Sequence, residues 1–302
     1  MFAVLPFTGC AFRTHPIVNR TSNAVLKDAT LEQLVEIINT NADRLNSLRA
    51  LPVNIDSSVL EEKKNQVKDN PEVSGWVLIR KPQMLHMRVL APVVHSTMID
   101  MVSDGNKFEL SVPPKNKFFV GSNRLAPDPS LSPLYKMRPQ HIFDALLLKR
   151  IDSAENEIAV LENSIEIVKD PKSHKDVEQA DYVVIVFAKD DAGYYLSRKI
   201  VFSRTDLLPH EQDIYNRQAQ LATYVHYENF TDYSGTMFPA IVSIQRPIEG
   251  YSITLSIGKL DLNLKLTDDQ FTIPQPPGSQ IINLDSKPAA AVLREDASKK
   301  PQ

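Results

Sequence analysis

A helical spacing of apolar residues is the first regular pattern along the chain. Thr30 and Gln33 have the T-x-x-Q spacing of a capping box, in which each side chain accepts a hydrogen bond from the other residue's backbone N–H. Behind this cap, apolar residues recur every three or four positions: Leu31, Leu34, Val35, Ile38, Ala42, Leu45 and Leu48. We therefore predict an amphipathic helix over residues 30–49 that lays one face on an apolar surface.

From residue 76 onward the apolar period changes to two, the spacing of strands with one buried face. Prolines and the pair Asp104-Gly105 separate the runs, and this pair is expected to form a hairpin turn. The predicted strands are residues 76–80, 85–90, 93–102, 107–112, 117–120, 164–168, 182–188, 194–202, 222–227, 240–245 and 251–257. A second helix is predicted from Pro139, at its first position, to about Arg150, with an apolar side made of Ile142, Phe143, Leu146 and Leu147.

The run from Leu260 to Leu266 decides what kind of sheet to expect. Its leucines alternate with polar residues, so we expect them to share one face of a strand while the other face meets water. A sheet with one apolar face either closes into a barrel or stays open and uses helices as a lid. Because two amphipathic helices are available, we predict a mainly β (α+β) fold. It would be a strongly curved antiparallel half-barrel of about eleven strands with helices covering the concave face.

Composition and charge exclude some classes of partner. The chain has 302 residues, of which 42% are hydrophobic and 24% charged, which is enough apolar material for a core. Its formal net charge is −3 and its seven histidines are scattered, so it lacks the basic field that binds nucleic acid. No run approaches the roughly 18–20 apolar residues that span a bilayer. Any membrane attachment would therefore come from a terminus or a covalent lipid.

Cys10 is the single cysteine, which excludes an internal disulfide and metal sites built on paired thiolates. It follows Thr8 and Gly9, and small residues before a cysteine are typical of a bacterial lipoprotein signal peptide. Phe7 departs from the usual leucine and a charged start is missing, which a start codon assigned too far downstream would explain; the alternative is a cytosolic protein with a chance cysteine. The expected organisation is a signal-peptide remnant (1–9), lipidated Cys10 with a tether (10–29), one folded domain (30–285) and a disordered tail (286–302).

Motifs for catalysis are missing from the sequence. It contains no nucleophile elbow, no H-x-x-x-H or H-E-x-x-H pair, no phosphate loop and no C-x-x-C pair. His86 and His95 fall on neighbouring predicted strands, but no third metal ligand accompanies them. Asp190 and Asp191 stand just before Gly193, where a turn is expected. We therefore expect no enzyme activity, no metal and no cofactor.

Two groups of residues resemble the consensus of the LolA/LolB-like lipoprotein-carrier superfamily. The first group comes in the family's order of a Gly-aromatic strand, a Pro before an arginine-bearing strand, a Pro and a DG turn: Gly75-Trp76, Lys81-Pro82, Arg88, Pro92, Asp104-Gly105 and Pro113. The second resembles the family's closing strands: Leu260 to Leu266, Asp269, Phe271, Ile273, Pro276-Pro277-Gly278 and Ile281-Ile282.

The resemblance covers roughly residues 30–284. It implies a curved half-barrel around a hydrophobic cavity that receives the acyl chains of lipoproteins or other lipids. Anchored members act as outer-membrane acceptors, so Cys10 would place this chain with them, in the bacterial envelope and facing the periplasm. The segment 127–179 is longer than in the short carriers, and residues 98–102 are strand-like rather than an exposed membrane-inserting loop.

Flexible methionines and bulky apolar side chains suit a cavity for mixed acyl chains. The candidate lining residues are Trp76, Leu78, Met87, Arg88, Val89, Met98, Met101, Phe108, Leu110, Leu255, Leu262 and Leu264. Arg88 could hold a helix or an acyl carbonyl, although the alternation around it favours a solvated strand face. The rival hypothesis is an envelope scaffold or sensor with a filled interior, which binds a protein partner through a sheet edge or its tail and carries no lipid.

Overall fold

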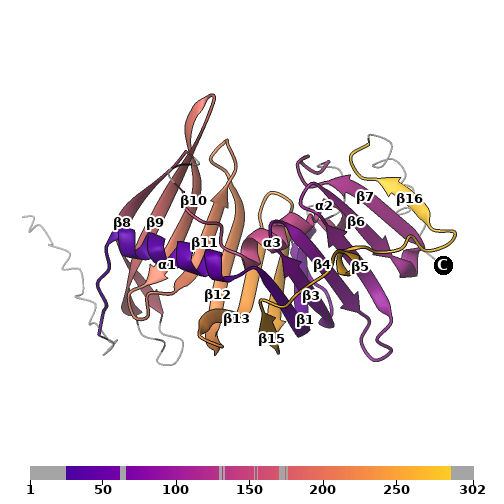
Figure 1. Cartoon of the computed structure of the whole chain (residues 1–302), viewed down its shortest axis with the longest axis horizontal. Coiled ribbons are helices and arrows are strands. Elements are labelled where there is room, and N and C mark those ends of the chain that lie inside the picture. The colour runs from indigo at the N-terminus through magenta and orange to yellow at the C-terminus, as the bar shows by residue number, and fades with distance from the viewer. Residues whose placement is uncertain are drawn as a thin grey trace, which may run out of the picture.

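One large, unclosed sheet organises the molecule. The structure, a computed structural model, describes residues 25–61, 66–128, 131, 133–152, 154, 156–169, 174 and 176–286. Within them, sixteen strands join in one sheet, of which fourteen form the path β16-β7-β6-β5-β4-β3-β1-β14-β13-β12-β11-β10-β9-β8, while β2 and β15 pair with β1 (Figure 1). In these described ranges, no helix is long and apolar enough to cross a membrane.

The elements follow one another in chain order. The helices are α1 (Leu31–Arg44), η1 (Pro113–Lys115), α2 (Pro133–Lys136), α3 (Pro139–Leu146) and η3 (Asp268–Phe271). The first strands are β1 (Ser47–Glu61), β2 (Gln66–Asp69), β3 (Val73–Arg80), β4 (Met84–Leu90), β5 (Thr97–Ser103), β6 (Lys107–Val112) and β7 (Lys117–Ser122). The remaining strands are β8 (Glu157–Lys169), β9 (Asp176–Asp190), β10 (Gly193–Ser203), β11 (Pro209–Tyr215), β12 (Leu221–Tyr233), β13 (Thr236–Arg246), β14 (Tyr251–Ile257), β15 (Leu260–Leu262) and β16 (Gln280–Asn283).

The register between strands assigns each side chain to one of two faces, because directly paired residues point to the same side. We call the face on which the helices pack the helix face. Across β3 to β7 it carries five directly paired residues: Val77, Met87, Met101, Leu110 and Phe119. It carries a second series in its other half: Ile244, Val225, Gln212, Ile200 and Val184. The opposite face carries Trp76, Arg88, Asp100, Ser111 and Phe118.

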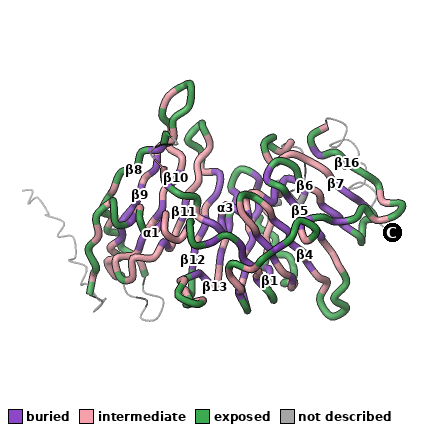
Figure 2. The backbone as a smooth tube through the Cα atoms, in the orientation of Figure 1, coloured by how far each residue is buried: buried purple, intermediate pink, exposed green. Residues whose placement is uncertain are grey.

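Two helices pack on different parts of the helix face. α1 buries Leu34 and Ile38 against Val184, Ile200 and Phe202 of β9 and β10, and it crosses β8 to β12 in Figure 1. α3 contacts β4, β5 and β13 and joins the larger core cluster. Buried residues run along the sheet beneath these helices in Figure 2. We predicted that helices cover the whole concave face. The contacts of α1 and α3 with the sheet show helices on these two parts of the helix face, so the wider prediction is not confirmed.

The opposite face has a cover of a different kind. After β15 the chain leaves the sheet, and its residues 264–273 lie over β3 to β5. Phe271 and Leu266 pack on Leu78, while Ile273 packs on Val102 and Phe118. The Arg80 guanidinium stacks on the Phe271 ring, 5.0 Å from its centroid, and donates to the Leu266 carbonyl at 2.8 Å. Over β3 to β5, the C-terminal segment therefore covers the apolar residues of the opposite face.

The predicted helix over residues 30–49 is wrong only in its last five residues. The capping box is present, with Gln33 N donating to Thr30 Oγ1 at 3.3 Å and Thr30 N to Gln33 Oε1 at 2.9 Å. The helix ends at Arg44, and Leu48 lies in β1, paired with Ile79. β1 escaped prediction because its register shifts between Ala50 and Val53, which breaks the period of two.

Other predicted elements need smaller corrections. The described residues form sixteen strands rather than about eleven, and β16 pairs with β7 in parallel, so the sheet is not wholly antiparallel. The strand predicted at 93–102 begins at Thr97, because a turn occupies the residues before it, and the second helix ends at Leu146. Leu260 and Leu262 belong to β15, whereas Leu264 and Leu266 pack on the opposite face, so the four leucines do not share one face.

The turn predictions are confirmed. Asp104 Oδ1 accepts from the N–H groups of Asn106 and Lys107 at 2.8 and 2.7 Å, and Gly105 has a φ of 90°. Asp190 and Asp191 lie at the turn between β9 and β10. The predictions for residues 1–9, for Cys10 and most of the tether, and for nearly all of the tail lie outside the described residues.

Candidate functional site

An apolar pocket lies where both helices meet the sheet. The last turn of α1 contributes Ala42, and Leu45, the first residue after the helix, also lines the pocket. Residues 145–148, at and beyond the end of α3, form another side. β12 and β13 supply the floor through Tyr227, Phe230, Met237, Phe238 and Pro239, and Leu208 and Pro209 close the rim. Most of these side chains are apolar, so the pocket suits a ligand without charge on its buried part.

The pocket is nearly closed. Its volume is about 50 Å³, whereas sites that hold small molecules have about 300–1,000 Å³. Met237, which lines the pocket, is 41% exposed, while Phe238 next to it is buried. A larger ligand therefore does not fit this form of the pocket.

Three polar contacts hold α3 on the sheet. The Tyr227 hydroxyl donates to the Ala145 carbonyl at 2.9 Å, and Gln212 Nε2 donates to the Asp144 carbonyl at 3.2 Å. At the start of the helix, His141 Nδ1 lies 2.9 Å from the Tyr251 hydroxyl. Burial lowers the pKa of His141 well below its ordinary value, so its ring is neutral and can accept this bond.

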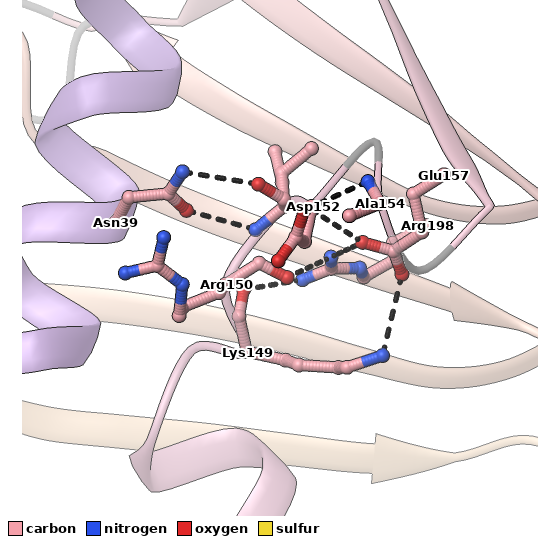
Figure 3. A network of polar contacts seen from close by, with 8 residues as sticks. Asn39, Lys149, Arg150, Asp152, Ala154, Glu157 and Arg198 are labelled. Carbon is pink, nitrogen blue, oxygen red and sulfur yellow. Dashed lines mark hydrogen bonds and ion pairs between the residues drawn. The ribbon is translucent and has the colours of Figure 1, made fainter.

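A second network fastens the chain after α3 to both α1 and the sheet (Figure 3). Asn39 of α1 makes two bonds to Ile151, from its Nδ2 to the carbonyl at 3.0 Å and from Ile151 N to its Oδ1 at 2.8 Å. Arg198 of β10 donates to the carbonyls of Lys149 and Arg150 at 2.7 and 2.8 Å, and it pairs with Glu157 at 3.1 Å. The segment between α3 and β8 therefore links the position of α1 to that of α3.

Two ionisable groups at this site have shifted pKa values. Burial raises the pKa of Asp144 to about 6, although Gln140 donates to its Oδ1 at 2.7 Å. Lys81 lines the pocket and donates to the Ala42 carbonyl, and burial lowers its pKa. Both groups are less easily charged than in water, as expected at the edge of an apolar volume.

The predicted cavity residues divide between the two faces. Met87, Val89, Met101, Phe108, Leu110 and Leu255 lie in the helix-face core, and Leu262 packs partly against it. Trp76, Leu78 and Leu264 lie in the cluster on the opposite face, so they cannot share a cavity with the first group. Met98 is half-buried in β5. None of the twelve lines the pocket in this closed form, and contact of the helix-face residues with a ligand stays a prediction.

Arg88 also lies on the opposite face. Its Nε and Nη2 donate to Asp100 Oδ2 at 3.0 and 2.6 Å, and its guanidinium lies 5.2 Å from the Trp76 ring. His86 Nε2 lies 2.7 Å from Asp100 Oδ1, and its Nδ1 lies 2.5 Å from the Gln270 carbonyl. Burial alone would raise the pKa of Asp100, but the bonds from His86 and Arg88 hold it below its ordinary value. This cluster fastens the C-terminal segment and does not face the pocket.

The residues that form the pocket were not singled out in the sequence. Phe238 precedes the strand predicted at 240–245, and Leu208 and Pro209 lie between predicted strands. Extending the predicted strand by two residues toward the N-terminus would have placed Phe238 on the same face as Val242, because the two are an even number of residues apart. Both are buried in the structure. Within the described residues, no group of three or more His, Cys, Asp or Glu side chains is placed to hold a metal ion.

Comparison with known proteins concerns the fold. Neither a family model nor a curated protein sequence matches the chain. Similar solved structures include a LolA superfamily protein from Nitrosomonas europaea, with 15% identity over 82% of this chain and 99% of that one and a TM-score of 0.47. A putative outer membrane lipoprotein-sorting protein domain from Vibrio parahaemolyticus has 12% identity over 80% and 97%, with a TM-score of 0.47.

A DUF1329 family protein from Desulfovibrio piger has 13% identity over 79% of this chain and 94% of that one, with a TM-score of 0.50. The identity is too low to transfer an activity or a site residue, so this likeness bears on architecture alone. The chain has the fold of this DUF1329 family protein.

Proposed function

We propose that this chain binds lipid, such as the acyl chain of a lipoprotein, in a cavity that opens on the helix face between α1, α3, β12 and β13. The observation that carries the proposal is the apolar pocket at the meeting point of two helices and the sheet. Burial of each CH₂ group there would contribute roughly 0.8 kcal/mol. The role is binding, with no catalytic step.

Opening is part of the proposed mechanism, because about 50 Å³ does not accommodate an acyl chain. α3 is the element to move, since it is short and is held on the sheet by the contacts of Tyr227, Gln212 and His141. Moving it would expose the floor residues Tyr227 and Phe238 and the neighbouring core residues Met87 and Met101. The apparent affinity for lipid would then equal the affinity of the open form multiplied by the fraction of molecules that are open.

Membrane attachment through Cys10 belongs to the same proposal, with the chain working in the bacterial envelope and facing the periplasm. Its support is the small pair Thr8-Gly9 before the cysteine. A bacterial strain fed a clickable fatty acid tests it: the full chain should carry the label, and Cys10→Ser should lose it. A labelled Cys10→Ser protein, or an unlabelled parent chain, would exclude this anchor.

Lipid binding is tested with the full chain purified from a bacterial periplasm. Native mass spectrometry with lipid extraction should find co-purifying phospholipid or acylated peptide, and a fluorescent fatty acid should bind with saturation. Met237→Glu places a charge at the pocket while leaving the core intact, and we expect it to weaken binding at least about tenfold. Val160→Glu is the matched control, because Val160 is also an exposed strand residue, at 47% against 41%, and lies in β8, outside the pocket lining. A clean apo mass with no uptake of added lipid would overturn the proposal.

The rival function, a scaffold that binds a protein partner, is favoured by one observation. β8 is the last strand of the sheet path and carries Ile158, Val160, Ile165 and Ile167 as exposed apolar side chains. An exposed edge strand with apolar side chains can accept a strand from another protein. In that case Val160→Glu would weaken partner binding and Met237→Glu would not, which is the reverse of the pattern expected for lipid.

A further inference from the structure

A second pocket lies on the opposite face of the sheet, beyond the part that residues 264–273 cover. It has a volume of about 560 Å³, within the range of about 300–1,000 Å³ for small-molecule sites. Val201, Glu211 and His226 are directly paired across β10, β11 and β12, and Asp181 of β9 pairs with Ser203. All five line the pocket, so adjacent strands present their side chains into one volume.

Asp181 is a buried carboxyl group in this pocket that is only partly hydrogen-bonded. The residue is only 5% exposed, and Gln179 donates to its Oδ2 at 2.7 Å, whereas its Oδ1 is buried and has no hydrogen-bond partner. Burial raises the pKa of this carboxyl. A buried acceptor without a partner destabilises the protein, so a ligand that donates a hydrogen bond here would remove that cost.

The neighbouring charges favour a cation as that donor. Glu211 and Glu228 lie 3.6 and 3.8 Å from the two ring nitrogens of His226. His226 holds the pKa of Glu211 below its ordinary value, so Glu211 is ionised, and Glu211 in turn raises the pKa of His226. The lining carries three carboxyl groups, those of Glu178, Asp181 and Glu211, against two imidazoles, those of His210 and His226, so acidic groups outnumber basic ones in the pocket. His226 Nδ1 is itself buried without a hydrogen bond.

The same pocket has an apolar wall. Val177 and Val201 line it from β9 and β10, and Leu26 lines it from the segment before α1. An aliphatic stem ending in a charged nitrogen matches this combination, because such chains lay their methylene groups on apolar surface and keep the charge at a polar group. A metal ion fits less well, since among the described residues no three carboxylates or histidines are arranged around a common point.

We propose that this pocket binds an alkylammonium group, with the ammonium donating to Asp181 Oδ1 beside Glu211 and the aliphatic stem on Val177 and Val201. The nitrogen would belong either to a free diamine or to a lysine side chain. The site lies on the other face of the sheet from the proposed lipid cavity, so either can exist without the other.

The test is calorimetric titration of the full chain with three probes. The first is 1,5-diaminopentane, the second is acetyl-Gly-Lys-Gly-amide, and the third is 1,5-pentanediol, which has the same length and no charge. We expect saturable binding of one molecule per chain for at least one amine and none for the diol. Binding of the diamine alone points to a free amine, and binding of the peptide alone points to a lysine. Binding of neither amine, or of the diol as strongly, overturns the proposal.

Substitutions locate the site. Asp181→Asn keeps the shape of the side chain and should weaken amine binding at least about tenfold. Asp190→Asn removes the same charge at the other end of β9, where Asp190 pairs with Arg217 at 2.6 Å, and should leave binding unchanged. If Asp181→Asn does not fold by circular dichroism, Glu211→Gln replaces it with the same expected loss. Equal affinity in the parent, the folded pocket variant and Asp190→Asn would overturn the site.

Discussion

Arg198 gives the sharpest test of how the segment between α3 and β8 is held. Its side chain and that of Glu157 are each 5% exposed, and they lie 3.1 Å apart. Arg198 also donates to the carbonyls of Lys149 and Arg150, so replacing it with methionine leaves two carbonyls and a buried carboxylate without their main donor. Breaking a buried pair from one side costs about 3–5 kcal/mol, and we expect Arg198→Met to lose stability in that range.

The assay is urea unfolding at neutral pH, followed by circular dichroism. A double variant, Arg198→Met with Glu157→Leu, should recover part of the loss, because no uncompensated charge then stays buried. Arg217→Met is the control: its pair with Asp190 is exposed, at 37% and 44%, and should be worth about 0–1 kcal/mol. A loss below about 1 kcal/mol for Arg198→Met, or a double variant worse than the sum of both single ones, would refute this reasoning.

Four further substitutions test other parts of the structure. Asp144 has a pKa of about 6 in the folded chain against an ordinary 3.8, so the parent chain should lose stability as the pH rises from about 4 to 6. Asp144→Asn should abolish this fall and be more stable than the parent above pH 6 by about 1–3 kcal/mol. Urea unfolding at four pH values measures both effects. Gly75→Ala would place a Cβ against the Arg88 carbonyl oxygen of β4, and we expect a loss of about 1–3 kcal/mol in the same assay. Tyr227→Phe should cost about 1–2 kcal/mol and raise the rate of fatty-acid uptake, measured by stopped-flow fluorescence, because it releases the end of α3. Phe271→Ala should shift the fluorescence of Trp76, the single tryptophan, to longer wavelength while leaving lipid binding unchanged, since both side chains lie on the opposite face.

Much of the β architecture follows from alternation, but the central strand does not. β1 joins the two halves of the sheet, between β3 and β14. Its first three residues were predicted as the end of a helix, and no strand was predicted for the rest. Leu45 and Leu48 fall on the helical spacing set by Leu34 and Ile38, although both lie beyond the end of the helix. The agreement is a coincidence, because helical spacing and strand alternation can both place an apolar residue at these positions. The register shift after Ala50 then hides the alternation that would have identified the strand. A bulge is set by pairing with neighbouring strands, which a single sequence does not contain.

The assignment of residues to faces fails for a related reason. Trp76 and Leu78 alternate with Val77, and Met87 alternates with Arg88, so the sequence fixes which residues within one strand share a face. It does not fix which set of one strand joins which set of the next, because that depends on register. The C-terminal segment adds to this, since Leu266 and Phe271 give the opposite face an apolar patch of its own. The apolar character of a strand residue therefore did not predict whether its side chain lies on the helix face or on the opposite face.

The pocket depends on tertiary contacts that lie still further from the sequence. It exists only where α1, α3 and the paired strands β12 and β13 meet, and α1 lies about two hundred residues before these strands in the chain. Its volume depends on how closely α3 lies on the sheet. The same contacts that close it also stabilise the fold, so stability without ligand and affinity for ligand should oppose one another. Each bond removed between α3 and the sheet lowers the free energy of unfolding and increases the fraction of open molecules, which increases the apparent affinity by the same factor. A chain in which stability and lipid affinity rose together on removal of Tyr227 or Gln212 contacts would not use this pocket.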